Sequence, residues 1–239
     1  YWGSPEKMQM HRPVGAVDAN RPGSEPTANA AASMAAASLV FQKAGDSGYA
    51  GQLLSKARKL YEFAETFKGK YSDNLYNPVN GRKMDVATFY ASWSGFQDEL
   101  TWGAAWLYKA TGEKAYLEKA ERYYRPGARE NAMSWDNQSH NNSLLLYQLT
   151  GKEQYAKDIE TMFNHWMNDM ARTPDGLSFS NSWGANRYAA NTAYQAILYA
   201  QELLEKNVKT PYAQKLVNYA TEQLDILMGD NSKKFSYIV

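Results

Sequence analysis

The chain has 239 residues, 44% of them apolar, and its 26 Lys and Arg residues nearly balance its 25 Asp and Glu residues. This apolar content indicates a globular chain that buries a core as one domain or as a compact part of a larger one. The near-neutral charge provides no basic surface for nucleic acid or anionic lipid, no apolar run reaches the length of a membrane span, and the lack of Cys excludes disulfides and thiolate chemistry.

Apolar residues at helical spacing run through most of the chain. An Ala-rich helix is predicted from Ser24 to about Lys43, and a second helix carries its apolar residues from Leu53 to Phe67. The same period predicts further helices at about 97–110, 114–124, 138–149, 153–171, 188–206 and 211–228. Glycines near the expected helix ends are typical of C-terminal caps: Gly45, Gly112, Gly151 and Gly229. The stretches 69–95 and 173–187 are predicted to be irregular.

A short sequence occurs twice. Leu107-Tyr108-Lys109-Ala110-Thr111-Gly112-Glu113-Lys114-Ala115-Tyr116 aligns with Leu146-Tyr147-Gln148-Leu149-Thr150-Gly151-Lys152-Glu153-Gln154-Tyr155. Each copy predicts a helix end, a Thr-Gly turn and a Tyr in the next helix. Weaker copies, at Gly48-Tyr49 and Pro211-Tyr212, are irregularly spaced. Helix hairpins in series with variable inserts indicate an α/α toroid and not a regular solenoid, and we expect the inserts to line a cleft at one end.

Three tryptophans lie in predicted loops beside small or polar residues. These are Trp93 in Ser-Trp-Ser-Gly, Trp135 in Ser-Trp-Asp and Trp183 in Ser-Trp-Gly. A flat apolar ring flanked by hydrogen-bonding groups suits a pyranose ring, although packing in the core is the general alternative for a tryptophan. We therefore predict that these three are sugar platforms. The other candidates lie within predicted helices and are assigned to the core: Trp102, Trp106 and Trp166.

The segment from Phe89 to Tyr108, Phe-Tyr-Ala-Ser-Trp-Ser-Gly-Phe-Gln-Asp-Glu-Leu-Thr-Trp-Gly-Ala-Ala-Trp-Leu-Tyr, closely resembles the signature of the family 9 glycoside hydrolases, the inverting cellulases. The resemblance extends over nearly the whole chain. Trp2-Gly3-Ser4-Pro5-Glu6 resembles the family's Trp-Gly-x-Pro-Glu segment, and the match closes on residues 227–231 and 235–237. One departure is Asn29, where the family usually carries an acid.

The resemblance implies which residues line the glucan site. The implied substrate-binding residues are Trp2, Phe89, Tyr90, Trp93, Trp183, Arg187 and Tyr188, and the loop context of Trp135 adds that residue.

Two interpretations apply to the adjacent acids Asp98 and Glu99. In the first, Ser94 and Gln97 form a capping box, and the acids favour the first turn of a helix. In the second, they bind calcium, an ion that takes hard oxygen ligands. The resemblance implies a structural calcium ion held by Ser94, Gly95, Asp98 and Glu99, with Asp136 as our candidate for a further acid. Adjacent helical residues diverge by about 100°, so Asp98 and Glu99 are poorly placed as a catalytic pair.

The resemblance implies an all-α fold, an incomplete (α/α)6 toroid built of helix hairpins. Residues 1–239 would form part of one catalytic domain that lacks its N- and C-terminal segments. The family's catalytic base lies in an Asp-Ala-Gly-Asp motif upstream of the segment matching Trp2, and its acid is a Glu downstream of the segment matching Tyr237. Neither stretch is in this sequence. No catalytic residue is assigned, and we expect this chain alone to be inactive.

The implied activity is hydrolysis of β-1,4-glucosidic bonds in cellulose or related β-glucans with inversion, as an endo-1,4-β-glucanase. One alternative is a non-catalytic glycan-binding or helical scaffold module. Another is a different toroid enzyme acting on glycans, such as an epimerase or an unsaturated-uronyl hydrolase. Such enzymes usually depend on His or on different acid pairs, and His11, His140 and His165 are scattered without the paired spacing of a metal site.

The expected partner is a β-1,4-glucan or cello-oligosaccharide, with no nucleic acid and no membrane. We also expect contact with the missing flanking segments of the same module, or self-association through exposed helix faces. The expected location is secreted or extracellular.

Overall fold

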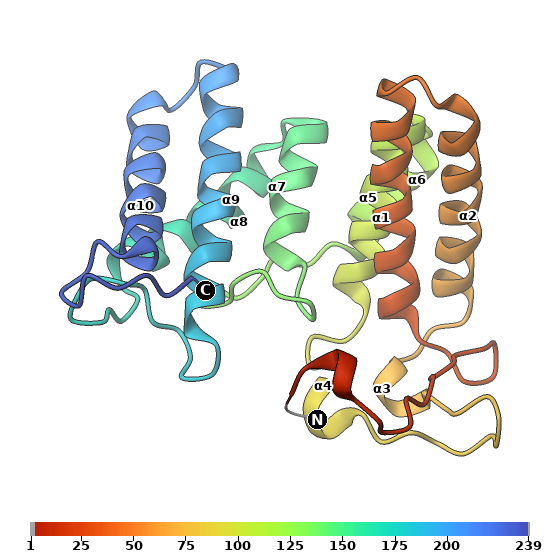
Figure 1. Cartoon of the computed structure of the whole chain (residues 1–239). Helices are drawn as coiled ribbons and strands as arrows, with labels where there is room; N and C mark the ends of the chain where they lie inside the picture. The colour runs from red at the N-terminus through yellow and green to blue at the C-terminus, as the bar shows by residue number, and fades with distance from the viewer. Residues whose placement is uncertain (1–2, 239) are drawn as a thin grey trace.

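The computed structural model describes residues 3–238, and its regular structure there is helical (Figure 1). In chain order the elements are η1 (Pro5–Lys7), α1 (Ser24–Lys43), α2 (Ser47–Thr66), α3 (Tyr71–Asn74), α4 (Ala87–Tyr90), α5 (Gln97–Thr111), α6 (Lys114–Tyr123), α7 (Ser139–Thr150), α8 (Glu153–Asn168), α9 (Ala185–Glu205) and α10 (Thr210–Met228). The residue pairs that form β-bridges are isolated ones in the loops, such as Ala16 with Tyr76. The predicted all-α class is confirmed.

The long helices pair into hairpins that stand side by side. α1 packs on α2, α5 on α6, α7 on α8 and α9 on α10, and the first helices of these hairpins contact one another in the order α1, α5, α7, α9 (Figure 1). A row of hairpins joined through one helix of each is the arrangement of an α/α toroid that has not closed. The predicted partial toroid therefore fits the described part of the chain.

The two ends of the hairpins differ in loop length. At one end the connections are short turns, 44–46, 112–113, 151–152 and 206–209. At the other end lie the long segments 67–96, 124–138 and 169–184, next to the first turns of α5, α7 and α9 (Figure 1). The expectation that the inserts collect at one end is confirmed.

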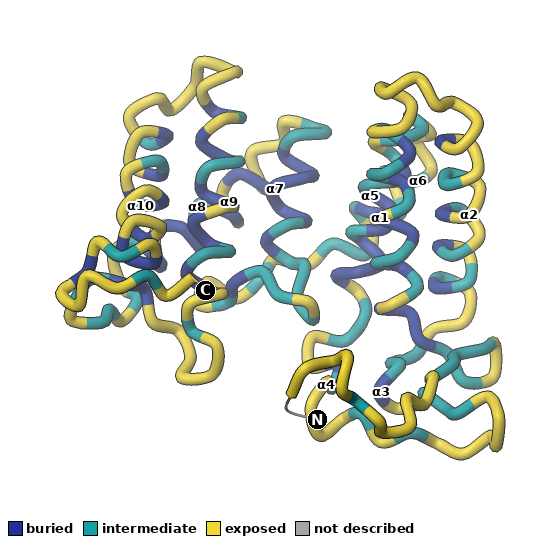
Figure 2. Tube along the Cα trace, viewed as in Figure 1, coloured by how far each residue is buried: buried dark blue, intermediate teal, exposed yellow. Residues whose placement is uncertain are grey.

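Small residues allow α1 to approach its neighbours closely. Ala28, Ala31 and Ala35 are fully buried, and α1 contacts both α2 and α5 (Figure 2). A Cβ atom at Gly103 of α5 would lie 2.8 Å from the Tyr61 ring and 3.1 Å from the Ala28 carbonyl oxygen. Since real Cβ atoms do not approach that closely, glycine is required at position 103 for this packing.

The sequence repeat corresponds to a repeated turn. Gly112 and Gly151 both end their helices in the left-handed conformation, with φ of 72° and 67°. Thr111 Oγ1 donates to the Leu107 carbonyl and accepts from the Glu113 amide. Thr150 Oγ1 likewise donates to the Leu146 carbonyl and accepts from the Lys152 amide. The predicted Thr-Gly turns are confirmed, because positive φ favours glycine at these positions.

Two helix boundaries differ from the prediction. α8 ends at Asn168 and not near 171, because the Arg172 guanidinium donates to the carbonyls of Trp166 and Met167 and so satisfies the end of the helix. α9 begins at Ala185 and not at 188, directly after Gly184, whose φ is +64°. The stretch predicted to be irregular, 69–95, also contains the short helices α3 and α4.

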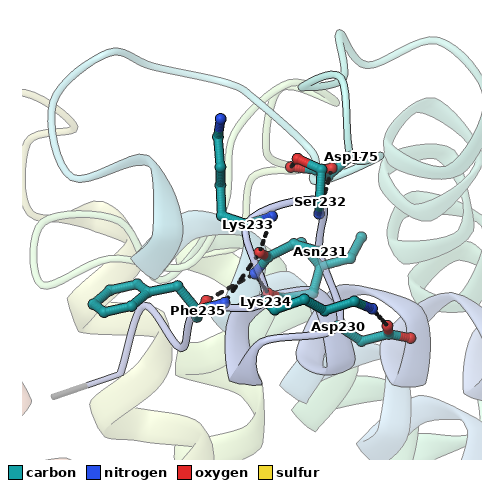
Figure 3. Close-up of polar contacts among 8 residues, drawn as sticks. Asp175, Asp230, Asn231, Ser232, Lys233, Lys234 and Phe235 are labelled. Carbon is teal, nitrogen blue, oxygen red and sulfur yellow. Dashed lines mark hydrogen bonds and ion pairs between the residues drawn. The ribbon is translucent and has the colours of Figure 1, made fainter.

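The segment after α10 folds back on the helix through polar contacts of Asn231 (Figure 3). Asn231 is buried, with 5% of its surface exposed. Its amide nitrogen donates to the carbonyls of Ile226 and Phe235, and its Oδ1 accepts from the Lys233 amide. The Asp175 carboxylate accepts from the backbone amide and the hydroxyl of Ser232, which ties the same segment to the 169–184 loop (Figure 3). Side chains far apart in sequence therefore order this segment.

The tryptophans divide as predicted between core and loops. Trp166 is fully buried, and Trp102 and Trp106 pack partly buried against the same core. Trp93, Trp135 and Trp183 lie outside helices. No helix in residues 3–238 combines the length and the apolar character needed to cross a membrane.

Candidate functional site

A cavity of about 460 Å³ lies among the long loops. Its lining comes from the segment before α5, the segment before α7, the loop between α8 and α9, and the first turn of α9. The lining residues are Trp93, Ser94, Glu130, Asn131, Ala132, Ser134, Trp135, Asp136, Asn137, Met170, Ser180, Asn181, Arg187 and Tyr188. The cavity therefore joins segments contributed by several hairpins.

Aromatic rings form one wall of the cavity. The Trp135 ring lies 5.6 Å from the ring centroid of Trp93 and 5.6 Å from that of Tyr90, both in edge-on orientation. Trp93 is 65% exposed and Trp135 is 39% exposed, so both present ring surface to solvent. Rings that are held by one another yet exposed provide rigid apolar surface for stacking.

Arg187 and Tyr188 form a second wall, at the start of α9. The Arg187 guanidinium lies 4.5 Å from the centroid of the Tyr188 ring, and its Nη2 donates to the Tyr188 hydroxyl at 2.6 Å. Gly184 places this turn, because its left-handed φ lets the chain enter α9 directly after the loop. The wall offers hydrogen-bond donors next to an aromatic face.

Asp136 joins the two loops that carry Trp93 and Trp135. Its carboxylate accepts from the backbone amides of Trp93 at 3.0 Å and Ser94 at 3.1 Å. The Ser94 hydroxyl donates to the Asp136 carbonyl. Burial raises the pKa of Asp136, and the two amides oppose that shift. The main role of Asp136 is therefore to connect the loop that carries Trp93 with the loop that carries Trp135.

A second cavity, of about 210 Å³, lies behind Trp135 and is rich in carboxylates. It is lined by Glu25, Pro26, Asn29, Tyr71, Glu99, Trp135 and Asp136. Both Glu25 oxygens accept from the Tyr71 amide, while Glu99 is 1% exposed and its Oε2 has no hydrogen-bond partner. Burial, and then the Asp98 carboxylate, raise the pKa of Glu99 to about 11. Burial also raises the pKa of Glu25.

Lys70 acts on this group at longer range, since its charge favours the ionised form of Asp136. Within residues 3–238, neither Glu25, Asp98, Glu99 nor Asp136 forms an ion pair with Lys or Arg. Buried carboxylates without a counterion are costly, so their proximity requires either protonation or a bound cation.

The capping-box interpretation of Ser94 is wrong. α5 begins at Gln97 with Phe96 at its N-cap and no side-chain cap, and the Ser94 hydroxyl contacts Asp136 and Asp98 instead. Asp98 accepts from the Gln138 amide at 2.8 Å, across the two loops. In the described part of the chain, no three Asp, Glu or His side chains are arranged to hold a metal. A calcium ion here would therefore also need neutral oxygens such as those of Ser94 and Gly95.

Only some of the predicted substrate-binding residues lie together in the structure. Trp93, Trp135, Arg187 and Tyr188 line one cavity, and Tyr90 contacts it through Trp135. Phe89 and Trp183 are 76% and 75% exposed and do not belong to its lining. Trp2 lies outside the described residues.

Sequence reasoning missed the polar residues of the cavity. Glu130, Asn131, Asn137, Ser180 and Asn181 line it between the aromatic walls. The usable signal was the concentration of Asn and Ser around the loop tryptophans, which suits hydroxyl-rich ligands.

Comparisons with known proteins match the whole chain to one family. The model of glycosyl hydrolase family 9 matches residues 1–239. Endoglucanase B of Cellulomonas fimi is 37% identical over 253 residues, covering 100% of this chain and 23% of that protein. Endoglucanase A of Bacillus pumilus is 36% identical, covering 100% of this chain and 36% of the relative. The chain thus spans less than half the length of these relatives.

Solved structures share the fold. The cellulase Cel9M of C. cellulolyticum superposes with a TM-score of 0.83 at 31% identity, covering 100% of this chain and 52% of that one, and it is also known with cellobiose. Endoglucanase CelQ of Clostridium thermocellum, solved with cellotetraose, superposes with a TM-score of 0.76 at 33% identity over 91% of this chain and 35% of that one.

Proposed function

Because the chain belongs to glycosyl hydrolase family 9, we propose that it forms the glucan-binding part of a cellulase, an endo-1,4-β-glucanase that cleaves β-1,4-glucosidic bonds with inversion. The observation that carries the proposal is the cavity of about 460 Å³ with Trp93 and Trp135 on one wall and Arg187 and Tyr188 on the other. Pyranose faces stack on the rings, and the hydroxyls meet the Asn, Ser and Arg groups. Solved relatives bound to cellobiose and cellotetraose support this choice of ligand.

The alternative of a glycan-binding module without catalysis predicts the same binding but no hydrolysis by any longer form of the protein. The scaffold alternative predicts neither. The aromatic cavity favours a binding role over a scaffold, because a scaffold needs no exposed, mutually braced indole rings. A polymer such as cellulose is met outside the cell, so we also propose that the protein is secreted.

The binding proposal predicts that the chain is retarded in a native gel containing hydroxyethyl cellulose and not in a gel containing dextran. Stacking on two indole rings requires the flat, extended β-1,4-linked chain, which the α-1,6 linkages of dextran do not provide. The measurement is electrophoretic mobility against polymer concentration. Equal mobility in both gels, from a chain whose circular dichroism spectrum shows that its helices are folded, would contradict the glucan proposal.

We further propose that the carboxylates near Ser94 hold a structural calcium ion. Asp98, Glu99 and Asp136 would supply charged oxygens after a rearrangement, because no three acidic side chains in residues 3–238 already surround one point. The Ser94 hydroxyl and the Gly95 carbonyl would supply neutral oxygens to an ion that takes about 6 to 8 oxygen ligands. The unpartnered Glu99 Oε2 supports the proposal, as does the lack of a direct ion pair to these acids within residues 3–238. A bound divalent cation would stabilise the junction between the two aromatic loops.

The calcium proposal predicts that millimolar calcium raises the melting temperature and that Asp98→Asn removes the rise. Occupancy at a hundred times Kd adds about 2.7 kcal/mol, and each kcal/mol shifts the melting temperature by about 2 to 4 °C for a chain of this size. The exposed Asp73 provides a matched control, since Asp73→Asn should keep the rise. Identical melting curves in calcium and in chelator would contradict a calcium site.

Exposed apolar side chains mark a further contact surface. Tyr194 and Leu204 on α9, and Leu224 and Met228 on α10, are all exposed. We propose that these helix faces pack against other segments of the same module or against a second copy of the chain.

A further inference from the structure

The loop between α6 and α7, residues 124–138, supplies half of the cavity lining yet contains no helix. It carries Trp135 and Asp136, so its position decides where the aromatic wall stands. On one side, Asp136 fastens it to the backbone of Trp93 and Ser94. The two ends of the loop are fixed by the Ala128 carbonyl, which is hydrogen-bonded to His140 Nε2 of α7, and by the Gln138 amide, which donates to Asp98. The stretch around Trp135 between these ends needs a second attachment besides Asp136 to hold a defined position.

Asn191 of α9 supplies that second attachment. Its Nδ2 donates to the Met133 carbonyl at 2.8 Å, two residues before Trp135. Within residues 3–238, this is the hydrogen bond that joins α9 directly to the loop 124–138. Asn191 follows Arg187 by four positions, so both lie on the same face of α9. One helix face thus carries the Arg187 wall and the attachment of the Trp135 wall.

A second connection runs one helical turn further along α9. Gln195 is fully buried, and its Nε2 donates to Asn141 Oδ1 at 2.8 Å. The Asn141 amide donates to Gln138 Oε1 at 2.7 Å, and Gln138 Nε2 donates to the Ser134 carbonyl. The side-chain amides of Gln195, Asn141 and Gln138 thus support the C-terminal end of the loop. Asn191 instead bonds Met133, which directly precedes the cavity-lining Ser134.

We propose that Asn191 is a positioning residue that sets the spacing between the Trp93 and Trp135 wall and the Arg187 and Tyr188 wall of the cavity. The inference rests on the proposed glucan-binding role of the cavity. Asn191 itself is absent from the cavity lining, so it acts through the backbone carbonyl of Met133. An amide donor is required, because a carboxylate at this position would face the carbonyl oxygen without a proton to share.

The test compares Asn191→Ala and Asn191→Asp with two reference variants of the 239-residue chain. Asn186→Ala is the matched control, since Asn186 is an exposed Asn on the same helix that does not line the cavity. Trp135→Phe gives the spectral signature of the Trp135 environment. Near-ultraviolet circular dichroism reports how the aromatic side chains are packed and needs no glucan, and calorimetric titration with cellotetraose reports binding.

The expected result is that both Asn191 variants keep their far-ultraviolet spectrum and change the near-ultraviolet bands that Trp135→Phe also changes. Their cellotetraose Kd should rise roughly three- to tenfold, the equivalent of one lost hydrogen bond, while Asn186→Ala matches the unmodified chain. If the unmodified chain binds no cellotetraose, the proposed function fails, and the spectral comparison still decides the role of Asn191. Unchanged near-ultraviolet bands in both Asn191 variants, or loss of helix in both, would overturn the inference.

Discussion

Trp135→Ala is expected to cause the largest loss of glucan binding of any single substitution in this chain. The Trp135 ring contacts Tyr90 and Trp93 at 5.6 Å and lines both the aromatic cavity and the carboxylate-rich cavity behind it. Its removal takes away a stacking surface and the brace of two other rings. We expect cellotetraose binding to weaken by about 2 to 3 kcal/mol, or roughly 30- to 150-fold, as measured by calorimetric titration.

Trp183→Ala is the matched comparison for Trp135→Ala. Trp183 is 75% exposed and stands outside the cavity lining, although its sequence context favours a sugar platform equally. Its loss should therefore cost less binding and leave the near-ultraviolet bands of the Trp93 and Trp135 pair in place. Normal binding by Trp135→Ala together with lost binding by Trp183→Ala would assign the platform to Trp183.

The second large effect concerns hydrolysis. The 239-residue chain is expected to release no reducing sugar from carboxymethyl cellulose above the buffer level. Inversion requires an acid and a base roughly 6.5 to 9.5 Å apart on opposite faces of the bond. In the described part of the chain, the carboxylates lining the aromatic cavity are Glu130 and Asp136, and both Asp136 oxygens accept backbone amides. We therefore expect Asp136 not to act with Glu130 as a catalytic pair.

The measurement is a reducing-sugar assay with an intact family 9 cellulase as the reference. Turnover comparable to that of the reference would contradict the expectation and would direct attention to Glu130 and Asp136. Glu130→Gln would then test the first of them, because the amide keeps the size of the side chain and cannot transfer the proton.

Some of the site could be predicted because its signals are local. Trp93 and Trp135 are flanked by small and polar residues, and that context correctly indicated exposed rings in loops. Trp183 has the same kind of flanking residues but is not part of the cavity lining. Flanking residues indicate that a side chain is exposed, and they do not indicate which cavity it faces. Ser94 and Gln97 fit a capping box by spacing, but Asp136 attracts the Ser94 hydroxyl from a different loop.

The helices and their turns follow from the sequence by itself. The Ala stripe of α1, the Thr-Gly turns at Gly112 and Gly151, and the helical period act over a few residues, and backbone preferences operate at that range. Tertiary structure alone decided which loops meet. Asp136 reaches the amides of Trp93 and Ser94, and Asn191 reaches Met133, only because the hairpins pack side by side with their long loops at one end. Such contacts between distant segments depend on the packing of whole helices, which no local pattern of residues encodes.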